Sequence, residues 1–362
     1  MMTSTRYVTT LFVFIIALLA LVASFNYVVN PYLIFSDKRI NGLNQYKADI
    51  NKFVRQAKAY QPIALPINTL LVGNSRVEMG LNPQHRCLPE NAYNLGLPGA
   101  GVELQVAYAL NLVRMKPEIN RIIMSLDFTD FTNRKPGGVR TEFSYSGQSR
   151  LYSKVDGQPN DRYWFATLKD RYMALLSLDA TISSVKTLLG QKPSASNRHI
   201  NGFNPANDVA EATRVEGPFQ IFNQTRRMLE GKLSNQYYES VKGLNNADFK
   251  ALALLNEQAQ QSNIELIYFI NPLHQSFFEV IDSADLSDGY QQWLQDVHEF
   301  LKPYPHIAFH DFNQMPGFTD EPYPEKKQRQ SLTWFWEPAH YKSELGDILL
   351  DNMLAHACPG KE

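Results

Sequence analysis

The chain has 362 residues, of which 44% are hydrophobic and 20% charged, and its formal net charge is −1. A chain of this length can bury a sizeable core, as one large domain or as two small ones. The near-neutral charge offers no bulk attraction to a polyanion, so the composition speaks against nucleic acid as a partner. The composition is compatible with binding of a short glycan, because aromatic side chains, which suit sugar binding, make up 12% of the residues.

The N-terminus carries a long apolar segment. No charged residue occurs between positions 7 and 36, and roughly 20 apolar residues suffice to cross a bilayer. One interpretation is a signal peptide cleaved near the small residues Val22–Ser24. The other is an uncleaved anchor that ends in the interfacial aromatic residues Tyr27 and Tyr32. We favour the anchor, because the apolar character continues past the cleavage site, and either interpretation predicts that the chain beyond residues 1–36 is exported.

Farther along, stretches typical of buried strands alternate with stretches of helical period. The predicted strands are residues 68–72, 92–95, 121–126, 265–270 and 306–310, and the predicted helices are residues 102–115, 247–261, 291–301 and 341–354. This alternation predicts the α/β class, in the form of a three-layer α/β/α sandwich with about five mainly parallel strands.

The alternation breaks between about residues 132 and 245. Polar and aromatic residues dominate there, and helical patterns occur near residues 166–189 and 225–244. We interpret this stretch as an insertion that caps one edge of the sheet. The predicted organisation is therefore a linker and helix at residues 37–64, followed by one domain at residues 65–362 that carries the insertion.

Two short motifs suggest nucleophilic chemistry. Gly73-Asn74-Ser75 follows a predicted buried strand, and Glu337-Pro338-Ala339-His340 lies near the C-terminus. Serines at the end of a strand often serve only as caps or turn residues. A serine at a strand end combined with a later acid–histidine pair is, however, what a serine esterase or acyltransferase requires. These residues make Ser75 a candidate nucleophile and His340 a candidate base, with Glu337 or a nearby backbone carbonyl as the group that would orient the imidazole.

The two cysteines, Cys87 and Cys358, allow two interpretations. In an oxidising compartment they could form one disulfide, and otherwise they are two separate buried thiols. The histidines are scattered singly along the sequence and match no spacing of metal ligands. The sequence therefore predicts no metal site and no cofactor.

These motifs resemble those of the SGNH/GDSL hydrolase superfamily, in particular its membrane-anchored bacterial envelope branch, which is similar to the alginate-acetylation type. The resemblance covers roughly residues 65–131 and 264–355. Gly73–Ser75 matches the Gly-Asp-Ser block with Asn for Asp, and Glu337–His340 matches the Asp-x-x-His block with Glu for Asp. The second block implies an oxyanion-hole glycine, for which Gly96 is the candidate.

The third block departs from the family pattern. The family has Gly-x-Asn-Asp, whereas this chain has Asp127 near the position of the glycine and Thr129 near that of the asparagine. The resemblance therefore implies an oxyanion hole made by Ser75, Gly96 and Thr129. The Thr129 side chain is shorter than the asparagine that donates at this position in the family. The resemblance also implies an anion at Asp127 close to the site, which would oppose a developing oxyanion. We expect Asp127 and Asp130 to be caps rather than catalytic acids.

Three further residues are candidates for binding substrate. Arg76 follows the proposed nucleophile and suits an anionic group on a glycan, although a surface salt bridge is the competing interpretation. His274 follows a predicted strand end on the same edge of the sheet. Trp336 could stack on a sugar, although a tryptophan near a turn more often packs against the protein.

The resemblance implies an O-acyl esterase or O-acetyltransferase that acts on an envelope or secreted polysaccharide. It implies a protein of the bacterial inner membrane with one N-terminal helix and the main domain in the periplasm or outside the cell. The alternative is a relative without catalytic activity that serves as a glycan-binding or scaffold subunit alongside other envelope proteins. A third interpretation is an unrelated flavodoxin-like domain that binds an anion at residues 73–76.

Overall fold

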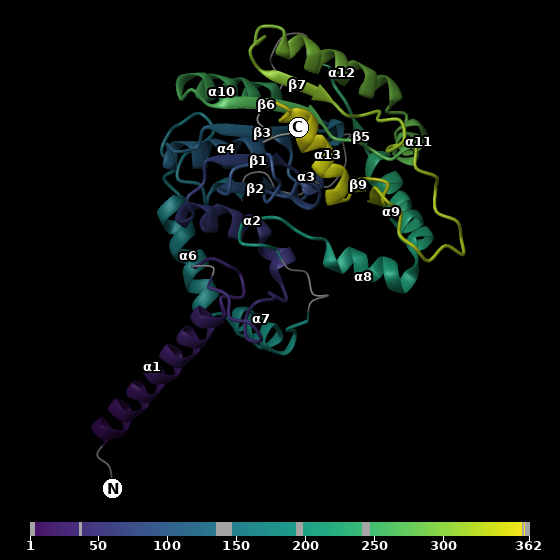
Figure 1. The fold of residues 1–362 in the computed structure, drawn as a ribbon. Coiled ribbons are helices and arrows are strands. Elements are labelled where there is room, and N and C mark those ends of the chain that lie inside the picture. The colour runs from purple at the N-terminus through teal and green to yellow at the C-terminus, as the bar shows by residue number, and fades with distance from the viewer. Residues whose placement is uncertain are drawn as a thin grey trace.

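The protein is built around a parallel β-sheet of five strands, with the order β2-β1-β3-β6-β7 (Figure 1). The computed structural model describes residues 4–35, 38–134, 147–192, 198–240, 247–356 and 358. The strands are β1 (Thr69–Gly73), β2 (Ala92–Gly96), β3 (Arg121–Leu126), β6 (Glu265–Ile270) and β7 (Ala308–Asp311). The predicted α/β class and the parallel strands are confirmed.

Helices cover both faces of this sheet. Leu70 and Val72 of β1 enter one core, whereas Leu71 between them enters the other. Because both faces of the central strands are buried, β1, β3 and β6 are largely apolar, whereas β7 at the edge of the sheet is partly exposed. The first core contains α2 (Ile50–Tyr60), α4 (Val102–Met115), α10 (Ala247–Gln261), α11 (Gln275–Ser283) and α12 (Ser287–Leu301); the second contains α3 (Ser75–Gly80) and α13 (Ser343–Met353).

The closing helix is shorter than the sequence predicted. We expected it to begin at Tyr341, but it begins at Ser343. The preceding residues are instead β9 (His340–Tyr341), which pairs antiparallel with β8 (Phe335–Glu337). The proposed acid and base therefore lie on a β-hairpin.

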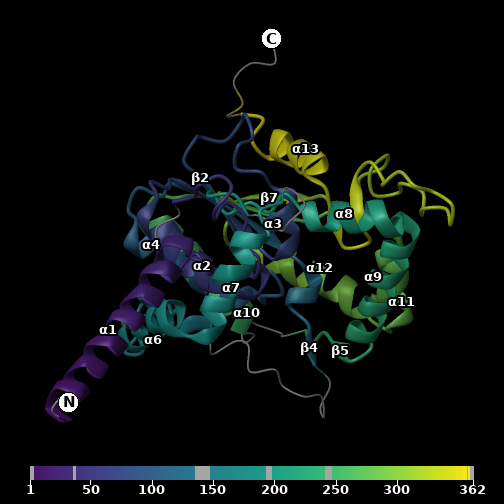
Figure 2. The same cartoon turned by 90° about the horizontal axis from the view of Figure 1, so that it is seen from below.

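The predicted insertion forms two pairs of helices. An antiparallel pairing of β4 (Asn133–Arg134) with β5 (Gln236–Tyr237) joins its two ends. The helices are α6 (Tyr163–Leu176), α7 (Leu178–Leu189), α8 (Asn207–Glu216) and α9 (Pro218–Leu233). Residues 135–146, 193–197 and 241–246 of the expected insertion lie outside the described residues. Figure 2 shows α6 and α7 beside the N-terminal helix and α8 and α9 across the molecule.

The remaining described elements are short, except for the N-terminal helix. They are η1 (Gln61–Ala64), η2 (Phe128–Asp130) and α1 (Ser4–Val29). Helix α1 has 26 residues and an unburied 18-residue window of mean hydropathy 2.7, so it is long and apolar enough to cross a membrane. It projects from the body of the protein (Figure 1).

Cys87 and Cys358 form a disulfide, with their Cα atoms 4.4 Å apart. The structure therefore agrees with the first interpretation of the cysteines, in which they form one disulfide. The bond ties the segment after α13 to the segment between α3 and β2 across 271 residues of sequence. A cross-link over so long a loop restricts the unfolded chain strongly.

We expect no reactive thiol in the unreduced folded protein and two after reduction in denaturant, because the chain has only two cysteines. Replacing both, as in Cys87→Ser with Cys358→Ser, should lower the free energy of unfolding by roughly 2–5 kcal/mol. Thiol titration and urea unfolding measure the two effects. Two reactive thiols in protein isolated without reductant would contradict the bonded pair.

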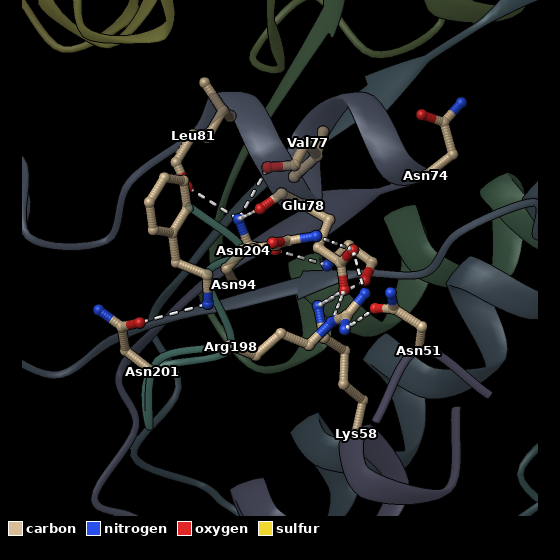
Figure 3. A network of polar contacts seen from close by, with 12 residues as sticks. Asn51, Lys58, Asn74, Val77, Glu78, Leu81, Asn94, Arg198, Asn201 and Asn204 are labelled. Carbon is tan, nitrogen blue, oxygen red and sulfur yellow. Dashed lines mark hydrogen bonds and ion pairs between the residues drawn. The ribbon is translucent and has the colours of Figure 1, made fainter. Parts of the chain in front are cut away.

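A buried ion-pair network ties α3 to three other parts of the chain (Figure 3). The Glu78 carboxylate lies 3.0 Å from Lys58 Nζ and accepts two hydrogen bonds from Arg198, at 2.8 and 3.0 Å. All three side chains are buried. Lys58 also donates to the carbonyl of Gly96, at 2.6 Å. Burial opposes ionisation of Glu78, but the two cations outweigh it and hold the pKa of this carboxyl below its ordinary value.

Glu78→Gln should lower the free energy of unfolding by about 3–5 kcal/mol, because it leaves two buried cations without their anion. The matched control is Glu211→Gln, which breaks an exposed pair with Arg214 and should leave stability essentially unchanged. Thermal and urea unfolding, followed by near-ultraviolet circular dichroism, compares the two variants. Equal effects of the two substitutions would contradict the expected cost of leaving Lys58 and Arg198 without their anion.

Candidate active site

Ser75 is the first residue of α3 and follows the end of β1 by two positions. Asn74 caps this helix by accepting a hydrogen bond from the backbone N–H of Arg76, at 2.8 Å. The turn needs glycine at position 73, because a Cβ there would lie 2.4 Å from both Ser125 and Val77. The hydroxyl of Ser75 is thus presented at the carboxyl edge of the sheet.

The β8–β9 hairpin brings the imidazole of His340 to Ser75. His340 Nε2 lies 2.7 Å from Ser75 Oγ, and His340 Nδ1 contacts the Glu337 carboxylate. The other carboxylate oxygen of Glu337 accepts the N–H of Ala339, at 2.8 Å. Glu337 and His340 pair across the hairpin, so the two-residue turn at Pro338 and Ala339 brings the carboxylate to the imidazole. With the carboxylate on Nδ1, that nitrogen carries the proton and Nε2 can accept the Ser75 proton.

Arg76 links the serine helix to this hairpin. Its Nε donates to the carbonyl of Ala339 at 2.8 Å, and its Nη1 lies 3.3 Å from Asp127. The guanidinium also lies over the ring of Phe277, with 5.4 Å to the centroid. Of the two interpretations of Arg76, the contacts favour the salt bridge, in a buried rather than a surface setting. Arg76 borders the cavity, but its charge is already paired inside the protein.

The Asp127 carboxylate is enclosed by donors. Besides the ion pair with Arg76, it accepts hydrogen bonds from the amides of Asn74 at 2.8 Å and Asn271 at 2.9 Å. The anion that we expected to oppose an oxyanion is therefore compensated. The same Asn74 amide also donates to Asp130, at 2.8 Å. Asparagine at position 74 thus bridges two carboxylates, whereas an aspartate would add a third.

Gly96 does not have the role that the resemblance implied. Its N–H donates to the side chain of Asn94 at 2.9 Å, and it does not line the cavity beside Ser75. A Cβ at this position would lie 2.5 Å from the backbone nitrogen of Glu78. Glycine is needed at position 96 so that α3 can pack closely on β2, and the prediction of Gly96 as an oxyanion donor is corrected here.

Gly99, three residues after Gly96, does line the cavity, together with Ser75 and Thr129, and its φ of +62° suits glycine. Among the described residues, neither its N–H nor that of Ser75 has a hydrogen-bond acceptor. Thr129 adds a hydroxyl, 3.5 Å from Arg76 Nη1. The signal was present in the sequence as a second glycine three residues after Gly96.

The other two candidates for substrate contact lie outside the cavity. His274 is fully buried, its Nδ1 accepts the N–H of Ser276 at 3.1 Å, and its Nε2 contacts the carbonyl of Glu321 at 2.7 Å. Burial lowers the pKa of this imidazole. His274 therefore caps α11 rather than binding substrate. The ring of Trp336 packs under the ammonium of Lys342, 4.7 Å from the centroid, which matches the packing interpretation.

A cavity of about 560 Å³ opens beside Ser75 and His340. The insertion supplies one wall, through the largely apolar faces of α8 and α9. The lining residues from these helices are Asp208, Val209, Ala212, Ile221, Gln224, Thr225, Met228, Leu229 and Lys232. Sequence reasoning missed this wall, because nothing in the local pattern of the insertion says which part of the sheet it covers.

Asp130 is the carboxyl in this cavity with a shifted pKa. Desolvation by burial, and then the nearby charge of Asp127, raise its pKa to about 7. The amides of Asn74 and Gln105 both donate to it, at 2.8 Å. Asp130 therefore titrates near neutral pH at the edge of the site.

One cluster of potential metal ligands occurs among the described residues, away from the cavity. The ligand atoms of His85, Cys87 and Asp351 lie within 4.8 Å of one another. Cys87 is bonded to Cys358, and Asp351 is paired with Arg86 at 2.7 Å. This donor set does not fit a metal ion while the disulfide is intact.

Comparison with known proteins does not assign the chain to a family. No protein-family model matches the chain. No curated protein matches it either.

Stability should depend on pH through Asp130. Because its pKa is raised from 3.8 to about 7, the folded state holds a proton that the unfolded state has lost between these values. This contribution to stability is complete below about pH 4 and falls as the pH rises toward 7, by at most about 1.4 kcal/mol per pH unit. Asp130→Asn keeps an acceptor for both amides and should flatten this part of the profile.

The control for this prediction is Asp288→Asn, which removes the same charge from an exposed position at the start of α12. Urea unfolding of both variants and the parent between pH 4 and pH 8 gives the slopes. A slope that Asp130→Asn leaves at the parent value would mean that Asp130 is ionised throughout this range.

Proposed function

We propose that this protein is a membrane-anchored serine O-acyl esterase or O-acyltransferase of the SGNH type, acting on an envelope or secreted polysaccharide. The observation that carries the proposal is the hydrogen-bonded chain from Ser75 through His340 to Glu337 at the wall of a cavity. A hydroxyl, an imidazole and a carboxylate in this order form the arrangement that activates a serine for attack.

In the proposed reaction, Ser75 Oγ attacks an ester carbonyl while His340 Nε2 takes its proton. The Glu337 carboxylate stabilises the imidazolium through Nδ1. The tetrahedral intermediate collapses, the ester C–O bond breaks, and His340 returns the proton to the departing alcohol. Water or a sugar hydroxyl then attacks the acyl-enzyme, again through His340, and restores the Ser75 hydroxyl. Water as acceptor makes the protein an esterase, and a sugar hydroxyl makes it a transferase.

The oxyanion of this reaction would be held by the N–H groups of Ser75 and Gly99 and by the hydroxyl of Thr129. Loss of one such donor typically lowers the rate by ~10²–10³-fold. The Asp127 carboxylate would oppose a negative charge on this oxyanion, but the Arg76 guanidinium, 3.3 Å away, compensates its charge. The cavity is large compared with an acetyl group, so it leaves room for part of a glycan beside the reacting ester.

The proposed location is the bacterial inner membrane, with one span and the main domain on the periplasmic side. Helix α1 is long and apolar enough for the span. The disulfide supports export, because disulfides persist mainly in oxidising compartments. The polysaccharide and any other envelope proteins would meet the domain there.

Labelling with a fluorophosphonate tests the proposed nucleophile. We expect the parent to react with one equivalent of label, Ser75→Ala to lose the label, and His340→Ala to react at least ~10³-fold more slowly. Ser287→Ala, a substitution on α12 away from the cavity, is the matched control and should label like the parent. Mass spectrometry of the intact protein measures the stoichiometry and the rate.

Failure of the folded parent to label would overturn the proposal. The alternative, a non-catalytic glycan-binding or scaffold subunit, would then be favoured. Glycan binding that is undiminished in Ser75→Ala would support that alternative.

A further inference from the structure

Helices α6 and α7 expose apolar side chains and bury polar or small ones. On α7, Leu178 and Leu189 are 74% and 80% exposed, and on α6, Trp164 and Phe165 are each 73% exposed. The full exposed apolar set on the two helices is Trp164, Phe165, Leu168, Tyr172, Met173, Leu178, Ile182, Val185 and Leu189. Monomeric soluble proteins rarely expose a contiguous apolar surface of this kind.

The buried faces of the same helices have the opposite character. The residues that face the protein are Thr167, Asp170 and Ala174 on α6 and Ala180, Ser183, Ser184 and Thr187 on α7. A helix on the surface of a water-soluble protein turns its apolar face inward. Here the pattern is inverted, so the side that faces away from the protein is matched to an apolar environment.

Both helices are attached to the end of α1. The side chain of Asn26 donates to the carbonyl of Leu175 at 2.9 Å and to the hydroxyl of Thr181 at 3.0 Å. It also accepts a hydrogen bond from Ser184, at 2.8 Å. The α6–α7 corner lies where α1 leaves the body of the protein (Figure 1).

The length of α1 sets the depth of this corner. Residues 4–21 are exposed along their whole length, and contact with the protein begins at Val22. At 1.5 Å per residue, the exposed part is about 27 Å long, close to the ~30 Å hydrocarbon core of a bilayer. If α1 spans the membrane, the α6–α7 corner begins where the hydrocarbon ends.

We propose that the exposed apolar faces of α6 and α7 lie in the headgroup and upper acyl region of the bilayer that α1 spans. Trp164 and Tyr172 are the amphipathic aromatic residues that favour this depth. Lys169 and Arg171 are exposed on the same helix and can reach lipid phosphates. The contact fixes the tilt of the domain on the membrane, which a single span would not do. This inference does not depend on the chemistry proposed for Ser75.

The experiment is spin labelling of the full-length protein in vesicles of phosphatidylethanolamine and phosphatidylglycerol. Labels are attached through Leu168→Cys on α6 and Leu189→Cys on α7. Leu19→Cys on α1 is the lipid control, and Val215→Cys, 61% exposed on α8, is the aqueous control. The native cysteines are bonded to each other and do not compete for the label. Power-saturation spectra measure collision with oxygen, which favours lipid, and with a neutral nickel chelate, which favours water.

We expect collision with oxygen to exceed collision with nickel at positions 19, 168 and 189, and the reverse at position 215. Labels at 168 and 189 that behave like the one at 215 would overturn the proposal. Labels at these two positions that neither reagent reaches would also overturn it, because a second copy or another protein would then cover the face. A water-exposed label at position 19 would overturn the premise that α1 spans the bilayer.

Discussion

The buried carboxylate of Glu78 is the contact on which the arrangement of the site depends. Helix α3 is six residues long and carries Ser75 at its start, so it cannot hold the serine in place by its own hydrogen bonds. Through Glu78 it is tied to Lys58, from α2, and to Arg198, from the insertion. Three parts of the chain that are far apart in sequence thus meet at one anion.

A second polar network holds the opposite side of the same helix. Arg76 joins Asp127, at the end of β3, to the carbonyl of Ala339 in the hairpin turn. Ser75 and His340 therefore lie on elements that share one buried guanidinium. A buried charge pair of this kind contributes little net stability, but the cost of breaking it is high, so it restricts the geometry more than it stabilises the fold.

Local signals in the sequence sufficed for the sheet, because strand ends and turns are encoded by neighbouring residues. The pairing of Ser75 with His340, 265 residues apart, was expected from the order of the motifs and from the family resemblance, not from local signals. Local signals failed where the answer depended on packing between distant segments. Gly96 and Gly99 occur in one motif, and only the close approach of α3 shows that Gly96 is needed for packing. The burial of His274, likewise, follows from the loop at Glu321, which no local pattern places there.

The two helix pairs of the insertion lie in different parts of the domain. One pair of its helices, α6 and α7, is fastened to α1 by Asn26, and the other pair, α8 and α9, forms a wall of the cavity beside Ser75. Arg198 lies on the connection between the two pairs and is held by Glu78. If α6 and α7 lie on the lipid surface as proposed, the ties of the insertion to α1 and to Glu78 would hold the cavity and the hairpin of His340 at a defined height above the membrane.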